Sequence, residues 1–157
     1  MHRPKLRKRD TSVKKTKQGA THLPPMEILI AKPPIWDSCD EAFELDGREI
    51  FCYGNIIYNP SGGRIPKWLM EHEKVHRGQQ GDDPEVWWIM YIDDPAFRLS
   101  QELEAHKKEF RVFRLMNHRG KDRVAYLEMI AERLASPMYG DMITKEEAMQ
   151  RIKQHGA

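Results

Sequence analysis

The spacing of apolar residues changes at residue 65, and this change limits the folds that the chain can adopt. Before it, short runs rich in β-branched and aromatic residues predict strands at 26–31, 49–53 and 55–58. From Ile65 onward the apolar residues recur with helical spacing, which predicts helices at about 65–79, 84–92, 96–117, 122–135 and 144–154. Strands followed by helices are typical of an α+β domain, so we expect a small antiparallel or mixed sheet and then a helical part.

Turn and cap residues mark several of these boundaries. Asp46-Gly47 is a dipeptide favoured in tight turns and predicts a hairpin between residues 43–45 and 49–53. Asp83-Pro84 is a suitable start for the second helix, with the aspartate as cap and the proline in the first turn. Thr144, followed by Glu147, forms a capping box that predicts the start of the last helix.

Charge divides the chain unevenly, although its 157 residues carry a net charge of only +2. Residues 1–17 hold eight Lys and Arg against Asp10, a charge of +7, and the remaining 140 residues carry −5. Residues 1–22 have no apolar period, so we expect a disordered basic tail followed by one domain at 23–157. Such a tail suits nucleic acid or an acidic protein surface, or serves solubility alone.

No apolar run reaches the length of a membrane span, and no secretory signal follows the basic N-terminus, so we expect a cytoplasmic protein without a membrane partner. The two cysteines, Cys39 and Cys52, are too few for a disulfide scaffold and are not spaced as a zinc knuckle. We expect two reduced, partly buried thiols, with a single bridge as the alternative.

Residues 72–76 read His-Glu-Lys-Val-His and match the pattern H-E-x-x-H. Histidines four apart on a helix lie one turn apart on one face, so His72 and His76 can converge on one ion. At about 100° per residue both fall within the apolar stripe of the helix and therefore point into the protein. The glutamate between them, Glu73, can reach a zinc-bound water and take its proton, which predicts one catalytic zinc per chain.

A catalytic zinc needs a third protein ligand, and the helix at 96–117 offers Glu102. Glu102 lies beside the apolar stripe of that helix, whereas Glu104 faces away. His106, one turn after Glu102, is either a second-shell partner or an alternative ligand. Asp82, six residues after His76, is a rival third ligand, although Gln79 occupies the position where some zinc peptidases require glycine.

These residues resemble the zincin metallopeptidases, specifically the glutamate-ligand branch called gluzincins. That branch has H-E-x-x-H on one helix and a glutamate on a later helix, and residues 102–105, Glu-Leu-Glu-Ala, resemble its E-x-E-A form. The resemblance implies a zincin-like domain that hydrolyses peptide bonds, with His72, His76 and Glu102 as zinc ligands and Glu73 as base. It also implies that residues 55–58 form the sheet edge along which a peptide or protein substrate lies. His106 stands where many relatives have an aspartate that orients a ligand histidine.

Other residues are candidates for stabilising the transition state: Tyr139, His118 and Arg98. Two further functions remain open. The chain could be a non-catalytic zincin-fold protein that serves in an assembly such as a phage particle, which would place it in the host cytoplasm or virion. It could also be a protease that residues 1–17 recruit to DNA.

Overall fold

The computed structural model describes residues 24–154, and within them the fold is mixed α+β. Its elements are β1 (Glu27–Leu29), α1 (Trp36–Phe43), β2 (Phe51–Tyr53), β3 (Ile56–Tyr58), α2 (Lys67–Gln80), α3 (Pro84–Asp93), α4 (Pro95–Met116), α5 (Gly120–Leu134), the 3-10 turn η1 (Pro137–Tyr139) and α6 (Lys145–Lys153). The small sheet before a helical part agrees with the prediction. The basic segment predicted at 1–22 lies outside the described residues.

The three strands form a mixed sheet in the order β1-β3-β2. β1 runs parallel to β3 and β2 runs antiparallel to it, so that Ile28 and Cys52 both pair with Ile57. Because β3 has a neighbour on each side, the prediction that residues 55–58 form a substrate-binding edge is wrong. Pairing on both sides satisfies the backbone hydrogen bonds of β3, and its central residue, Ile57, is fully buried.

The hairpin predicted around Asp46-Gly47 is also wrong. Phe43 is the last residue of α1, and the hairpin joins β2 to β3 through Gly54, whose φ of 60° is one that glycine adopts without strain. Asp46 instead forms a local turn, since its carboxylate accepts the backbone N–H of Arg48 at 2.8 Å. The sequence does not predict helix α1, because only Trp36 and Cys39 of its eight residues are buried and so short a segment shows no apolar period.

The five helices predicted from the apolar period are confirmed, with ends that differ by at most two residues. Their caps form as expected: Asp83 accepts the N–H of Val86 at 3.1 Å, and Thr144 accepts the N–H of Glu147 at 3.1 Å. α4 has a further cap in Asp94, which accepts from Ala96 and Phe97. None of the helices within residues 24–154 has the length and hydropathy that crossing a bilayer requires.

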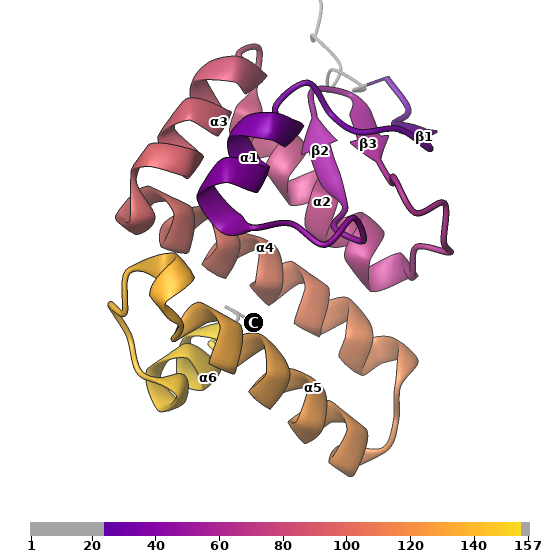
Figure 1. The fold of residues 1–157 in the computed structure, drawn as a ribbon. Coiled ribbons are helices and arrows are strands. Elements are labelled where there is room, and N and C mark those ends of the chain that lie inside the picture. The colour runs from indigo at the N-terminus through magenta and orange to yellow at the C-terminus, as the bar shows by residue number, and fades with distance from the viewer. Residues whose placement is uncertain (1–23, 155–157) are drawn as a thin grey trace, which may run out of the picture.

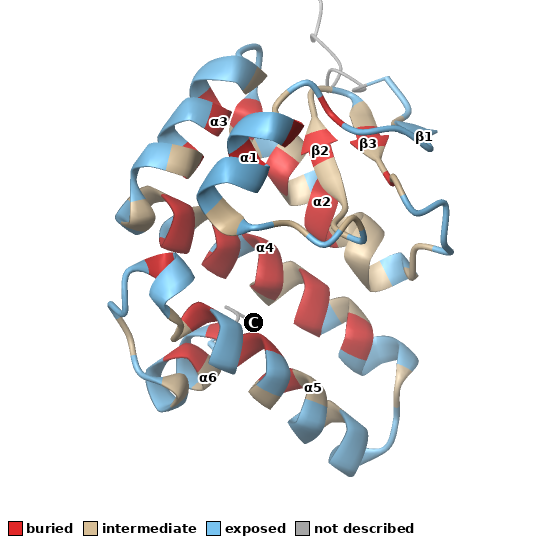
Figure 2. Cartoon of the chain, in the orientation of Figure 1, coloured by how far each residue is buried: buried red, intermediate tan, exposed pale blue. Residues whose placement is uncertain are grey.

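Helix α4 runs through the middle of the molecule (Figure 1), with buried residues along much of its length (Figure 2). On one side it packs against α2, and on the other against α5 and α6. The apolar core beside α5 and α6 includes Leu103, Leu127 and Ile130. A second core joins α1, α3 and β2 around Trp87, Trp88 and Cys39. Both cysteines are free and fully buried.

The last residue of α2, Gln80, binds the backbone of the hairpin between β2 and β3. The side chain of Gln80 accepts the N–H of Gly54 at 2.8 Å and donates to the carbonyl of Cys52 at 2.6 Å. The indole of Trp88 donates to the same carbonyl at 3.1 Å. These buried hydrogen bonds satisfy polar groups that would otherwise be costly, and they fix α2 between the sheet and α4.

Candidate metal centre

Two histidines of α2 point toward α4 from successive turns. Both are buried, and their Nε2 atoms are 3.0 Å apart, with ring centroids separated by 4.7 Å. The cause is the position of His72 and His76 within the apolar stripe of α2, which packs on α4. The structure therefore confirms the inward orientation predicted from the helical period.

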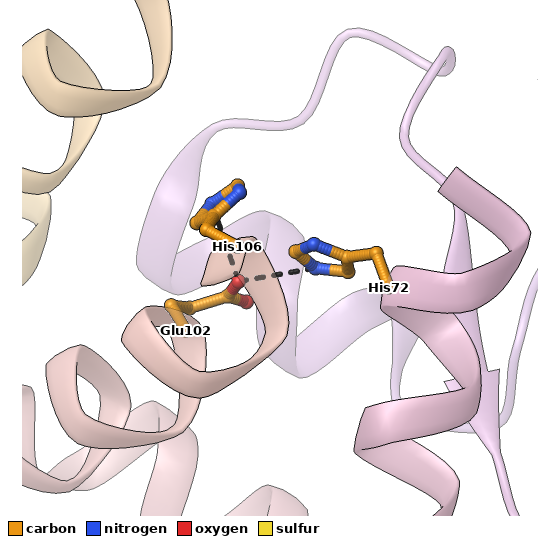
Figure 3. Close-up of side chains that lie close together, drawn as sticks. All are labelled: His72, Glu102 and His106. Atoms are coloured by element: carbon orange, nitrogen blue, oxygen red, sulfur yellow. Dashed lines mark ion pairs between the residues drawn. The ribbon is translucent and has the colours of Figure 1, made fainter. Parts of the chain in front are cut away.

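Glu102 on α4 faces both histidines. One carboxylate oxygen, Oε2, is 3.2 Å from Nε2 of His72, and the other, Oε1, is 3.2 Å from Nε2 of His76. Figure 3 shows Glu102 and His72 pointing toward one another across the interface between the two helices. Glu104 is exposed and accepts a hydrogen bond from Gln79 of α2 at 3.2 Å, so the choice of Glu102 over Glu104 as the inward residue is confirmed.

The spacing of these donor atoms is compared with that of ligands around a tetrahedral ion. Zinc binds histidine nitrogen at about 2.0–2.1 Å, and two ligands at the tetrahedral angle are then about 3.3 Å apart. The Nε2 atoms of His72 and His76 are 3.0 Å apart, and each lies 3.2 Å from a different oxygen of Glu102. The donor types, two imidazoles and a carboxylate, are those of catalytic zinc sites.

The outer nitrogen of each α2 histidine has a partner of its own. Nδ1 of His76 is 2.8 Å from Oε1 of Gln79, and Nδ1 of His72 is 2.8 Å from Oε1 of Glu109. The Gln79 oxygen favours the His76 tautomer with the proton on Nδ1, which leaves the Nε2 lone pair directed inward, whereas the contact of His72 with Glu109 is not aligned as a hydrogen bond. Tyr91 completes this outer layer by donating its hydroxyl to Oε1 of Glu102 at 2.8 Å.

His106 is the third buried histidine of the group. Its Nε2 lies 3.6 Å from Oε2 of Glu102, and its ring centroid is 4.6 Å from that of His72 (Figure 3). His72, Glu102 and His106 can each offer a donor atom within 4.8 Å of the others. His76 is not part of this group, although its Nε2 lies 3.0 Å from that of His72 and 3.2 Å from Oε1 of Glu102, so His76 and His106 are alternative third donors beside His72 and Glu102.

Glu109 lies behind the histidines and was not predicted. Its Oε1 is within 2.8 Å of Nδ1 of His72 and 3.2 Å of Nδ1 of His106, although neither contact is aligned as a hydrogen bond. Its Oε2 accepts the hydroxyl of Tyr126 at 2.8 Å. The available signal was its position, since Glu102, His106 and Glu109 follow one another at i, i+4 and i+7 on one face of α4. Gln79 was not predicted either, and its spacing was the available signal: it lies three residues after His76, on the same face of α2.

Charge pairing dominates the electrostatics of this buried group. Burial alone would lower the pKa of His72, but the nearby carboxylates of Glu102 and Glu109 outweigh it and raise that pKa well above its ordinary value. Burial alone would raise the pKa of Glu102, yet His76 and His72 hold it well below its usual range. The carboxylates are thus kept ionised and available as ligands.

Glu73 differs from the other buried carboxylates. Its side chain is 7% exposed, and within residues 24–154 it accepts no hydrogen bond and forms no ion pair. Burial raises its pKa, while His72 and His76 act in the opposite direction. The oxygens of Glu73 are not among the fully enclosed side-chain atoms that lack a hydrogen-bond partner.

The remaining predicted residues lie elsewhere. Asp82 is exposed in the turn between α2 and α3, and His118 is exposed in the turn after α4, so neither joins the group. His118 lies too far from the histidine group, because ten residues of α4 separate His106 from the end of the helix, a length of about 15 Å at 1.5 Å per residue. Asp82 fails because α2 ends before it, at Gln80.

Two further candidates are buried and already engaged. Tyr139 packs in the apolar core beside α5 and α6, and burial raises its pKa. The guanidinium of Arg98 donates to the carbonyls of Met138, Tyr91 and Ile92. Arg98 therefore holds η1 against the junction of α3 and α4 and uses four of its five N–H donors there.

No protein-family model matches the chain, and neither a curated protein nor a solved structure matches it. What the site can do is therefore argued from its own geometry and chemistry.

Proposed function

We propose that the protein is a zinc-dependent hydrolase of peptide bonds, with a zincin-like arrangement of its metal site. The observation that carries this proposal is the convergence of two imidazoles and one carboxylate at 3.0–3.2 Å, next to the buried Glu73, which forms no ion pair within residues 24–154. His72, His76 and Glu102 would hold one zinc ion per chain, and Glu73 would be the base. Zinc, when bound, supplies a Lewis acid that acidifies water and polarises a carbonyl group.

Glu73 is suited to moving a proton in this reaction. Its raised pKa brings the carboxyl group nearer to the pH at which a general base both accepts and returns a proton. It would take a proton from water as the oxygen adds to the carbonyl carbon. It would then deliver that proton to the departing amine nitrogen as the C–N bond breaks, which leaves a carboxylic acid and an amine.

A second candidate function has one observation in its favour. His106 directs its Nε2 toward Glu102 at 3.6 Å, and the histidines of the group are at most 7% exposed. A metal ion with four protein ligands is typical of structural sites, because no position remains for water. In that case the protein would bind zinc for stability and serve without catalysis, for example in an assembly.

Metal content and peptidase activity together test the proposal. We expect one zinc per chain in the wild type and in Glu73→Gln, and less than a tenth of that in His72→Ala, His76→Ala and Glu102→Ala. Wild type should cleave casein that carries a quenched fluorophore. Glu73→Gln should keep its zinc but cleave this substrate at least about a hundredfold more slowly. Folded wild type without zinc, or equal rates in wild type and Glu73→Gln, would reject it.

His106→Ala distinguishes the two candidates. An open catalytic site would keep its zinc in this variant, because three ligands remain. A closed structural site would lose zinc in His106→Ala as it does in His72→Ala, and wild type would show no hydrolysis.

A further inference from the structure

The side of α4 that faces away from α2 has a basic groove. A cavity of ≈ 200 Å³ opens between α4, α5 and α6, three helices that lie side by side (Figure 1). Its cationic lining consists of Lys107, Arg111, Arg114, Arg123 and Lys153, and it includes no acidic residue. A second cavity of ≈ 550 Å³ adjoins it, since Lys107 lines both, and adds Arg151 together with Glu104. We call these two cavities the basic groove.

The basic groove contrasts with the charge of the domain around it. Residues 24–154 contain 18 Lys and Arg and 23 Asp and Glu, a net charge of −5. Yet residues 107–123 hold seven Lys and Arg, and Asp122 is their only exposed acid, because Glu109 is buried. None of the cations that line the groove forms an ion pair in the part of the chain that the structure describes. Clustered cations repel one another, so this segregation favours an anionic partner.

Part of the groove is held in place before any partner binds. Arg123 donates to the carbonyls of Asn117 at 2.6 Å and Arg114 at 2.8 Å, which satisfies carbonyl groups at the end of α4. The guanidinium of Arg114 lies 5.8 Å from the centre of the Phe110 ring, and Phe110 and Ile152 are buried at the base of the groove. Arg111 and Arg114 are exposed on the α4 side of the groove.

We propose that the basic groove binds the phosphate backbone of a nucleic acid. Arginine supplies four of the six cations, and its planar fork matches phosphate oxygens in pairs. Two adjoining open cavities suit a polymer whose charges repeat along its length better than a single small anion. Residues 1–17 of the same chain carry a charge of +7, so a nucleic acid complements the charge of this segment as well as that of the groove. The groove is on the other side of α4 from the histidines, and this proposal does not rest on hydrolysis.

The test is binding of full-length protein to a short fluorescein-labelled DNA duplex, followed by anisotropy over a range of salt concentrations. The groove variant carries two changes, Arg111→Glu and Arg114→Glu. The control variant carries Lys32→Glu and Arg48→Glu, the same charge change at exposed positions in the loops around α1. We expect the groove variant to lose at least about tenfold more affinity than the control. The slope of log K against log salt should fall by about 2 in the groove variant.

Three results would overturn the proposal. The first is equal loss of binding in the two variants, and the second is no loss in either. The third is competition by a poly-glutamate peptide as strong as that by unlabelled duplex, which would identify an acidic protein as the partner. Circular dichroism checks that the groove variant is folded. If it is not, Arg111→Gln with Arg114→Gln removes the same charges and should still weaken binding more than Lys32→Gln with Arg48→Gln.

Discussion

Helix α4 has two buried faces, and their side chains differ in kind. Toward α5 and α6 it presents Leu99, Leu103 and Phe110, which pack in an apolar core. Toward α2 it presents Glu102, His106 and Glu109, which lie among other charged or titratable groups. We refer to these as the apolar face and the polar face.

The two faces contribute to stability in different ways. Apolar burial stabilises a fold without any ligand, at roughly 25 cal/mol per Å² removed from water. Buried charges must instead recover the cost of leaving water through their partners, and removing one partner leaves the others uncompensated. A helix interface built from histidine and glutamate is therefore a poor choice for stability alone and a suitable one for holding a cation.

The first prediction concerns the apolar face, where the largest loss of stability is expected. Leu127 on α5 is 1% exposed in the core against α4, so Leu127→Ala should lower the free energy of unfolding by about 2–5 kcal/mol. Urea denaturation measures the loss. The loss should be the same with and without EDTA, because the change does not touch the polar face. A loss that disappears in EDTA would show that the two faces are coupled.

The second prediction removes the metal from the polar face. If zinc binds only the folded protein, its removal by EDTA should cost about 4 kcal/mol of stability at a free zinc concentration of 1,000 Kd. Thermal unfolding of the zinc-loaded and stripped protein measures this difference. Glu102→Gln should unfold at the same temperature in both conditions, because it lacks the ligand. An equal response in wild type and Glu102→Gln would indicate that the stabilising ion binds elsewhere.

The third prediction tests the outer layer of the polar face. Glu109→Gln keeps the size of the side chain but removes the charge next to the Nδ1 atoms of His72 and His106, so zinc affinity should fall about 10–100-fold. Titration against a chromophoric zinc chelator measures it. Tyr126→Phe is the matched control, because it removes only the hydrogen bond to the other oxygen of Glu109. A comparable fall in Tyr126→Phe would show that Glu109 acts through general packing and not through the histidines.

The sequence predicts the apolar face of α4 more completely than the polar face. The period of apolar residues alone locates α2, α3, α4, α5 and α6 to within two residues and orients His72, His76 and Glu102 inward. Such periods work because each helix buries one continuous stripe. The same helical spacing places Glu109 on the face of α4 that carries Glu102 and His106, although its charged neighbour Lys108 favours a solvated position. Contacts with His106 of the same helix and with His72 of α2 accompany its burial.

The sheet was harder to predict than the helices. A strand of three residues contains too few alternations to show a period, and Asp46-Gly47 is a stronger local turn signal than Gly54-Asn55, where the hairpin occurs. Long-range contacts decide the outcome, since Gln80 and Trp88 both bind the backbone of Cys52 from helices far along the chain. Local propensity carries no information about such partners.

The fourth prediction has the smallest effect and concerns a helix that covers only the apolar face. The hydroxyl of Thr144 accepts the N–H of Glu147 at the start of α6, so Thr144→Ala leaves that donor without its cap and should cost about 1 kcal/mol. Thr144→Ser keeps the hydroxyl and should cost less. Both variants should bind zinc as wild type does, because α6 packs on α4 and α5 and contributes no group to the polar face. Reduced zinc affinity in Thr144→Ala, measured under conditions where the protein is folded, would mean that the polar face needs the apolar one for its geometry. Unchanged affinity alongside lower stability would mean that α4 is rigid enough to keep the two faces independent.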